Sequence, residues 1–300
     1  MFDGSGVWVA IPTPFTATAE RAVDHAALKR LMAHLKAARV KGIVALGSTG
    51  EPWSLDDSEQ DEVLDTILGD AGSMPVVAGL GGNHVGRLHQ RLSVLNGLPL
   101  AGVISAPPPY ARPSQAALAE HFRRLAEVSR APLLLYDIPY RAGVAIELPT
   151  ILALAAHENI VGIKDCGGSA AKTQAVIEDG RLAVLAGEDA QVFSSLCLGG
   201  AGAITAAANV CPQAFVDMFE AVRDGRIDDG RRLQHALRPV IDAMFAEPNP
   251  ALVKAALSAR GLAGDAVRAP LLGATEAGRA GVLKALAAFD AAQSSKGSPT

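Results

Sequence analysis

The stretch Ile160-Val161-Gly162-Ile163-Lys164-Asp165 is a short apolar run that ends in a lysine and an aspartate. A continuous apolar run without alternation is typical of a parallel strand that is covered on both faces. Runs of this kind recur along the 300-residue chain, and longer amphipathic stretches separate them. The predicted strands are residues 7–11, 42–46, 75–78, 101–105, 132–136, 160–163, 182–186 and 202–205.

The stretches between these strands have helical patterns. Leu28, Leu31 and Leu35 follow one face of a helix, and Asp56 with Glu59 three residues later has the form of a helix-opening cap. Eight strands alternating with helices predict a closed (β/α)8 TIM barrel. An open, doubly wound sheet is the alternative, because counting strands does not distinguish the two.

The strand pattern stops at about residue 225, which predicts a barrel domain over residues 1–225. Residues 231–245, 250–260 and 275–291 have helical patterns, so we expect a C-terminal helical extension over residues 226–292. Residues 293–300 are polar and rich in serine and glycine, which is typical of a flexible tail.

Composition excludes several classes of protein. Hydrophobic residues make up 49% and charged residues 19%, which is unlike a disordered or fibrous chain. A net charge of −4 gives no general attraction for nucleic acid or an anionic membrane. Cys166, Cys197 and Cys211 lack metal-ligand spacing, and the seven histidines form no metal pattern. The N-terminus has no signal-peptide pattern, so we expect a cytoplasmic protein without metal or organic cofactor.

Polar side chains gather where the predicted strands end. In a barrel of this kind, catalytic groups lie at the ends of strands and in the loops that follow them. The hydroxyls and cations at these positions are Ser48, Thr49, Tyr110, Tyr136, Arg141 and Lys164. We therefore expect these side chains to meet at one rim of the barrel.

Lys164 directly follows an apolar run and has three interpretations. Its side chain could extend from the barrel mouth, pair with Asp165, or serve as an activated amine. Partial burial disfavours the ammonium form and lowers the pKa of a lysine, which suits a nucleophile that forms a Schiff base. The position alone favours neither the catalytic nor the structural role.

The other polar residues are also ambiguous when taken singly. Tyr136 is suited to proton transfer or to a buried structural role. Ser48 and Thr49, in a turn flanked by glycines, could bind a carboxylate or only shape the turn. Arg141 could bind a second carboxylate or be an ordinary surface residue. The glycine-rich stretch 79–83 lacks the spacing of a nucleotide-binding loop, so it is predicted to be a structural turn.

Five linked motifs resemble one known family. They are GSTGE (47–51), YDIPYRAG (136–143), GIKD (162–165), AGEDA (186–190) and EPNP (247–250). In this order they resemble the dihydrodipicolinate synthase / N-acetylneuraminate lyase family of Schiff-base pyruvate aldolases. The similarity extends from residues 9–15 to the C-terminal helices.

The resemblance implies a role for each matching residue. Lys164 would form the Schiff base, and Tyr136 and Ser48 would relay protons. Tyr110 would complete the relay from a neighbouring subunit, and Thr49 would bind the pyruvate carboxylate. The implied residues lining the keto-acid pocket are Gly187 and Ile204.

Arg141 matches the arginine that synthases of this family use for the carboxylate of aspartate semialdehyde. The implied reaction condenses pyruvate with L-aspartate 4-semialdehyde to 4-hydroxy-tetrahydrodipicolinate, a step of lysine and diaminopimelate biosynthesis. The family also implies a homotetramer, a dimer of dimers, with small molecules as its other partners. An aldolase or dehydratase for a 2-keto-3-deoxy sugar acid is the alternative, and a keto-acid-binding protein without turnover is a third reading.

The chain departs from the family pattern at three places. Pro109 replaces the first of two paired tyrosines, Ser48 replaces a common threonine, and Asp137 replaces a common asparagine. Synthases that lysine inhibits have a polar pocket at the dimer interface. The matching positions here are Pro52, Trp53, Asp57, Gln60, Asn83, Arg87 and Pro109. Fewer acceptors and the cation of Arg87 predict little or no inhibition by lysine.

Overall fold

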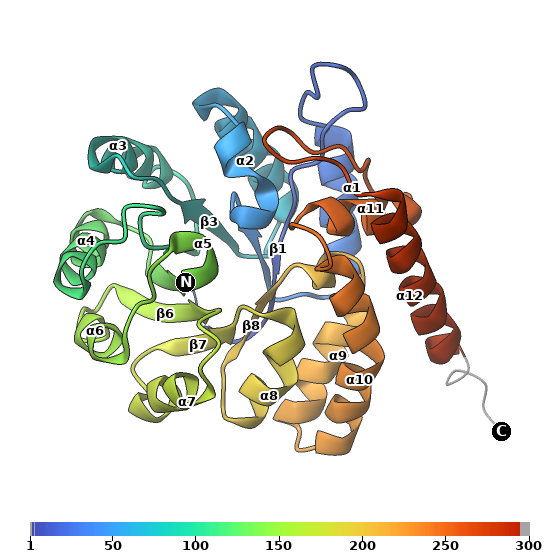
Figure 1. Ribbon diagram of the computed structural model, residues 1–300. Helices are drawn as coiled ribbons and strands as arrows, with labels where there is room; N and C mark the ends of the chain where they lie inside the picture. The colour runs from blue at the N-terminus through green and yellow to red at the C-terminus, as the bar shows by residue number, and fades with distance from the viewer. Residues whose placement is uncertain (1, 3, 295–300) are drawn as a thin grey trace.

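The structure is a computed structural model that describes residue 2 and residues 4–294. Eight parallel strands form a closed barrel in chain order, and β1 pairs with both β2 and β8 (Figure 1). The strands are β1 (Gly6–Ala10), β2 (Gly42–Ala45), β3 (Val76–Leu80), β4 (Gly102–Ser105), β5 (Leu133–Asp137), β6 (Ile160–Asp165), β7 (Ala183–Ala186) and β8 (Gly202–Thr205). The predicted TIM barrel is confirmed, and the open sheet is wrong.

The helices between the strands cover the outside of the barrel, except the short helix at residues 139–142, which lies at the carboxyl ends of the strands. They are α1 (His25–Ala37), α2 (Asp57–Ala71), α3 (Val85–Leu95), α4 (Gln115–Val128), α5 (Pro139–Ala142), α6 (Leu148–Leu154), α7 (Ala170–Asp179), α8 (Val192–Cys197) and α9 (Pro212–Arg223). Leu28, Leu31 and Leu35 of α1 are buried, as the pattern predicts. The predicted cap of α2 is also confirmed, because Glu59 N donates to Asp56 Oδ1 at 2.9 Å and Asp56 N donates to Glu59 Oε2 at 3.2 Å.

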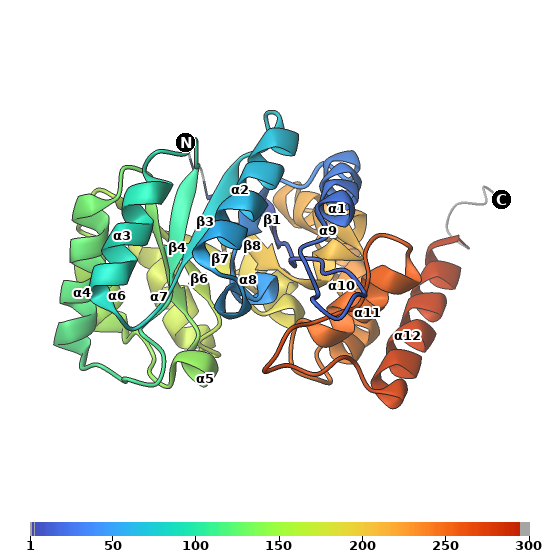
Figure 2. The ribbon, with the colours of Figure 1, turned by 90° about the horizontal axis from the view of Figure 1, so that it is seen from above.

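Three helices follow the barrel: α10 (Ile227–Met244), α11 (Ala251–Ala259) and α12 (Glu276–Ser294). Figure 2 shows them together on one flank of the molecule, next to α1 and α9. The first begins four residues earlier than its pattern predicts. The last includes residues 293 and 294 of the predicted tail, and residues 295–300 lie outside the described part. None of the helices described here is both long and apolar enough to cross a membrane.

The barrel interior is filled with apolar side chains at the amino-terminal end of the strands. Trp8 is fully buried and its ring packs against Phe2 with centroids 4.9 Å apart. A Cβ on Gly42 would collide with the Trp8 ring, so only glycine fits beside it. Filling this end leaves the carboxyl ends of the strands as the place for a cavity, as in other barrels of this type.

Candidate active site

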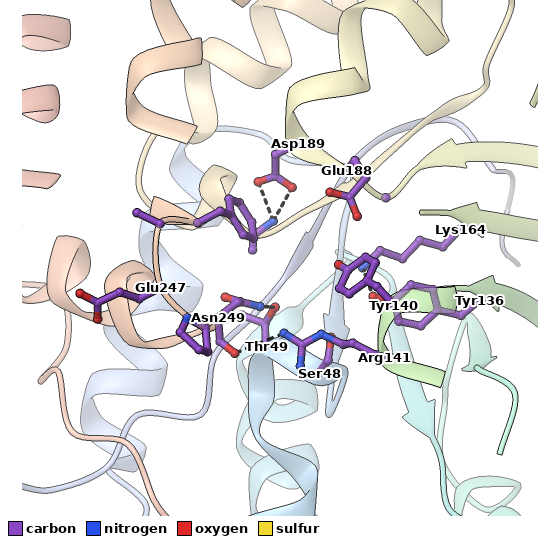
Figure 3. Close-up of a pocket in the computed structure, with 15 residues that line it drawn as sticks. Ser48, Thr49, Tyr136, Tyr140, Arg141, Lys164, Glu188, Asp189, Glu247 and Asn249 are labelled. Carbon is purple, nitrogen blue, oxygen red and sulfur yellow. Dashed lines mark hydrogen bonds between the residues drawn. The ribbon is translucent and has the colours of Figure 1, made fainter. Parts of the chain in front are cut away.

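A cavity of about 330 Å³ opens at the carboxyl ends of the strands (Figure 3). Its walls come from the ends of β5 and β6, from the loops after β2, β5, β7 and β8, and from residues 245–249, between α10 and α11. The predicted site residues that line it are Ser48, Thr49, Tyr136, Arg141, Lys164 and Gly187. The structure thus brings most of the predicted site together.

Lys164 and Tyr136 form the centre of the site. They are register partners on the neighbouring strands β6 and β5, so the two residues lie at the same height along the barrel axis. Lys164 Nζ lies 3.2 Å from Tyr136 Oη and 4.3 Å from the centre of the tyrosine ring. Lys164 is only 7% exposed, yet it lines the cavity, so its amine can meet a small ligand.

The expected lowering of the Lys164 pKa is wrong for this site. Burial does lower the pKa of Lys164, but its neighbours, chiefly the hydrogen-bonded Tyr136 and the Asp189 carboxylate, raise it by more, and it lies above its usual range. Burial raises the pKa of the Tyr136 phenol, so the phenol keeps its proton. The pair therefore rests as an ammonium beside a neutral phenol, and a nucleophilic amine requires loss of a proton.

Two hydroxyls come from a short 3-10 turn, Ser48–Gly50, after β2. Thr49 is buried, and its Oγ1 accepts a hydrogen bond from Asn249 Nδ2 at 2.9 Å. The Ser48 hydroxyl interacts with the Tyr136 phenol by a hydrogen bond that lowers the phenol pKa. Burial raises the same pKa by more. The turn lies close to β3, because Gly79 lacks the Cβ that would collide with Leu46 O. Gly79 therefore has a structural role, but it belongs to β3 and not to the turn predicted over residues 79–83.

Arg141 lies on the short helix α5 and faces the same cavity. Its Nη2 donates to the backbone oxygen of Asn249 at 3.4 Å. Among the described residues no carboxylate pairs with its guanidinium. The geometry leaves this cation available to a carboxylate in the cavity.

Two predicted residues lie elsewhere in this single chain. Tyr110 is 93% exposed, has a positive φ of 69°, and does not line the cavity. Ile204 on β8 is 1% exposed and lies in the barrel core with Trp8 and Leu185. Gly187 does border the lysine, because a Cβ there would stand 2.9 Å from Lys164 Cγ.

Several residues of the cavity wall have no predicted role from the sequence. They are Tyr140, Glu188, Asp189, Phe245, Glu247 and Asn249. Asp189 is buried and accepts a hydrogen bond from Ala206 N at 3.1 Å (Figure 3). It also accepts one from Ala207 N at 2.6 Å. Burial raises its pKa to about 6. All of these residues except Phe245 lie inside the motifs YDIPYRAG, AGEDA and EPNP, which is the signal that could have identified them.

A second cavity of about 500 Å³ shares Ser48, Tyr136, Arg141 and Lys164 with the first. Its outer rim contains Pro52, Trp53, Gln60 and Pro109, four of the positions that match the lysine pocket of inhibited synthases. The Gln60 amide already donates to Leu55 O at 3.2 Å. Within the described residues, no group of three or more His, Cys, Asp or Glu side chains is placed to hold a metal ion.

A lysine amine beside a tyrosine hydroxyl at the carboxyl end of a TIM barrel has the groups that a class I lyase uses to form a Schiff base. The sequence profile of the dihydrodipicolinate synthetase family matches residues 3–289, and the chain belongs to this family.

The 4-hydroxy-tetrahydrodipicolinate synthase of Methanosarcina mazei is 36% identical over 283 residues, which cover 93% of this chain and 96% of the relative. The structure is also similar to that of dihydrodipicolinate synthase from Acinetobacter baumannii in complex with pyruvate. That comparison gives a TM-score of 0.92 and 30% identity, covering 95% of this chain and 99% of the other. The enzyme from Cyanidioschyzon merolae with lysine bound gives a TM-score of 0.91 and 28% identity, covering 95% and 98%.

Proposed function

We propose that the protein condenses pyruvate with L-aspartate 4-semialdehyde to 4-hydroxy-tetrahydrodipicolinate, as a cytoplasmic enzyme of lysine and diaminopimelate biosynthesis. The observation that carries this proposal is the unpaired guanidinium of Arg141 in the same cavity as Lys164 and Tyr136. The semialdehyde has a carboxylate for this cation, and its aldehyde then faces the lysine-bound pyruvate. The names of the curated relatives agree with this activity.

The first stage forms the imine. Lys164 loses a proton, its neutral amine attacks C2 of pyruvate, and water leaves. Tyr136 Oη, 3.2 Å from the amine, and the Ser48 hydroxyl transfer the protons. Thr49, which Asn249 holds in place, binds the pyruvate carboxylate.

The second stage forms the carbon–carbon bond and the ring. The iminium draws electrons from the methyl group, which loses a proton to give the enamine. The enamine carbon attacks the aldehyde of the semialdehyde, whose carboxylate lies on Arg141. The amine of the substrate then replaces Lys164 at C2, which closes the ring and frees the enzyme.

An aldolase or dehydratase for a 2-keto-3-deoxy sugar acid would share the first stage and differ in the second substrate. Steady-state kinetics with aspartate semialdehyde and a panel of sugar aldehydes separates the two. We expect the highest kcat/KM for aspartate semialdehyde. In an Arg141→Leu variant, kcat/KM for this substrate should fall about 10²-fold, with little change in the KM for pyruvate. A sugar aldehyde as the best substrate would contradict the proposal.

A keto-acid-binding protein without turnover is the remaining alternative. Borohydride reduction in the presence of pyruvate, followed by mass mapping, should place one adduct on Lys164. The Lys164→Arg variant should give none, because a guanidinium does not lose its proton at working pH. Pyruvate binding without any adduct in the unmodified protein would favour the binder.

We further propose that Tyr110 acts in the site of a neighbouring subunit and that the enzyme is a homotetramer. Its 93% exposure and its place outside the cavity agree with a contribution to another copy. Sedimentation should show a tetramer. Mixed oligomers of Tyr110→Phe and Lys164→Arg chains should regain activity, because some sites then receive both intact residues.

Inhibition by lysine is expected to be weak or absent. The rim positions Pro52, Trp53 and Pro109 offer few acceptors for an ammonium group. A lysine titration of the initial rate tests this directly. Strong inhibition at millimolar lysine would contradict it.

A further inference from the structure

Three carboxylates line the active-site cavity, and only one of them lacks strong partners. Asp189 accepts hydrogen bonds from two backbone N–H groups, and Glu247 accepts one from Thr275 N at 3.2 Å. Glu188 makes no ion pair among the described residues, and its Oε1 is buried without a hydrogen-bond partner. The thiol of Cys166, a weak donor, is its polar neighbour.

An unpaired carboxylate inside a protein is costly, because water is lost and no donor replaces it. The negative charge of Glu188 affects the pKa values of the groups around it. Burial is the main cause of the raised pKa of Tyr140, Cys166 and Asp189, and the charge of Glu188 raises each further. Among the described residues, no ion pair and no hydrogen bond to Oε1 offsets this negative charge.

Glu188 and Arg141 approach the same space from different sides. Figure 3 shows the Glu188 carboxylate pointing toward Tyr140 and Lys164, with Arg141 on the other side of Tyr140. A ligand with one carboxylate and one ammonium group would satisfy both. Pyruvate has no ammonium group, and neither has a 2-keto-3-deoxy sugar acid, so this pair of charges fits an amino-acid aldehyde as the second substrate.

We propose that Glu188 binds the ammonium group of the second substrate and accepts its proton before the ring closes. This inference rests on the proposed function, since it requires a second substrate with an amine. Glu188 would then have two roles: it selects an aldehyde that carries an amine, and it acts as a catalytic base.

The proton transfer fits the last stage of the reaction. The substrate ammonium gives one proton to the Glu188 carboxylate, and the freed nitrogen lone pair forms a bond to C2 of the iminium. One proton moves from the new nitrogen to the nitrogen of Lys164, whose bond to C2 then breaks. Lys164 leaves as a neutral amine, the ring nitrogen becomes the iminium, and Glu188 later releases its proton to water.

The test compares Glu188→Gln with the unmodified enzyme on two aldehydes. Aspartate semialdehyde has the amine, whereas succinic semialdehyde has the same carboxylate and aldehyde without it. We expect Glu188→Gln to lower kcat/KM for aspartate semialdehyde by about 10²-fold, the usual size of a lost general base. The rate at which succinic semialdehyde joins the pyruvate adduct, followed by mass after borohydride quench, should change by less than about threefold.

Glu247→Gln is the matched control, because it removes one negative charge from the same cavity wall. Its carboxylate accepts from Thr275, and Figure 3 shows it turned away from Lys164. It should affect the two aldehydes alike.

Equal losses on both aldehydes in Glu188→Gln, or no loss on aspartate semialdehyde, would overturn the inference and leave the proposed function standing. If the unmodified enzyme forms the pyruvate adduct but does not turn over aspartate semialdehyde, the proposed function fails and the inference fails with it.

Discussion

At the scale of single residues, the described part of the chain contains two buried lysines with different roles. Lys164 is 7% exposed and Lys254 is fully buried. Lys254 pairs with Glu51, donates to Ala266 O at 2.9 Å and lies 4.1 Å from the centre of the Phe15 ring, so nothing can reach its amine. Lys164 has a phenol on one side and the cavity on the other. Access to a ligand, rather than burial, distinguishes the nucleophile.

The raised pKa of Lys164 predicts how imine formation depends on pH. Below its pKa, the fraction of neutral amine rises about tenfold for each pH unit. The single-turnover rate of imine formation at limiting pyruvate should therefore rise from pH 6 to 9 without levelling off. In Tyr136→Phe, which lacks a group that raises this pKa, the curve should move to lower pH while the maximal rate falls. A plateau reached by pH 7 in the unmodified enzyme would contradict this assignment.

At the scale of elements, one buried ion pair closes the loop that presents Arg141. Asp137, at the end of β5, pairs with Lys172 of α7 and is fully buried. Ile146 N donates to Asp137 Oδ1 at 2.9 Å, and Lys172 Nζ donates to Ile146 O at 3.4 Å. The ends of the loop around α5 are thus joined at its base. The departure from asparagine at position 137 has a reason here, because the charge of Lys172 compensates it.

Removing only one member of this pair should be costly. Lys172→Met leaves the Asp137 carboxylate buried and unpaired, so we expect a loss of about 3–5 kcal/mol of unfolding free energy. Asp137→Asn combined with Lys172→Met removes both charges and should recover most of it. Urea unfolding of the two single variants and the double variant measures the coupling. A loss in the double variant equal to the sum of the two single losses would show that the pair contributes little.

Strands and helices could be predicted from the sequence because their signals are local. Runs such as 160–163 are apolar over a few residues, and the cap at Asp56 needs only Glu59. The wall formed by residues 245–249 could not be predicted in this way, since Asn249 reaches Thr49 across 200 residues of chain. The error over the Lys164 pKa has the same origin. Burial follows from the strand pattern, whereas the neighbours Tyr136 and Asp189 come from other strands and loops.

At the scale of the whole molecule, the helices after the barrel take part in building the site. Asn249 contacts Thr49 and Arg141, and Lys254 of α11 pairs with Glu51, two residues beyond Thr49. Arg268 N donates to Glu51 Oε2 at 3.0 Å, which ties the loop before α12 to the same carboxylate. Residues that follow the barrel in sequence therefore hold the turn that carries the Ser48 and Thr49 hydroxyls in place. A boundary at residue 225 stays a prediction, and the site needs residues on both sides of it.

The Glu51–Lys254 contact also makes the stability of the molecule depend on pH. Burial lowers the pKa of Lys254 to about 8 in the folded protein, whereas an unfolded lysine titrates near 10.4. Between these values the unfolded chain binds more protons than the folded one. The free energy of unfolding then rises with pH. Its slope against pH has the sign of the number of protons bound by the unfolded chain minus the number bound by the folded chain.

The reference for this effect is Glu51→Gln combined with Lys254→Met, which removes both charges and leaves every other titrating group in place. The stability of the unmodified protein relative to this variant should increase between pH 8 and 10, by up to about 2–3 kcal/mol. Urea unfolding of both proteins at half-unit steps of pH gives the difference directly. A difference that is flat across this range would mean that Lys254 keeps its proton in the fold, and the ion pair would then stabilise the molecule equally at both ends of the range.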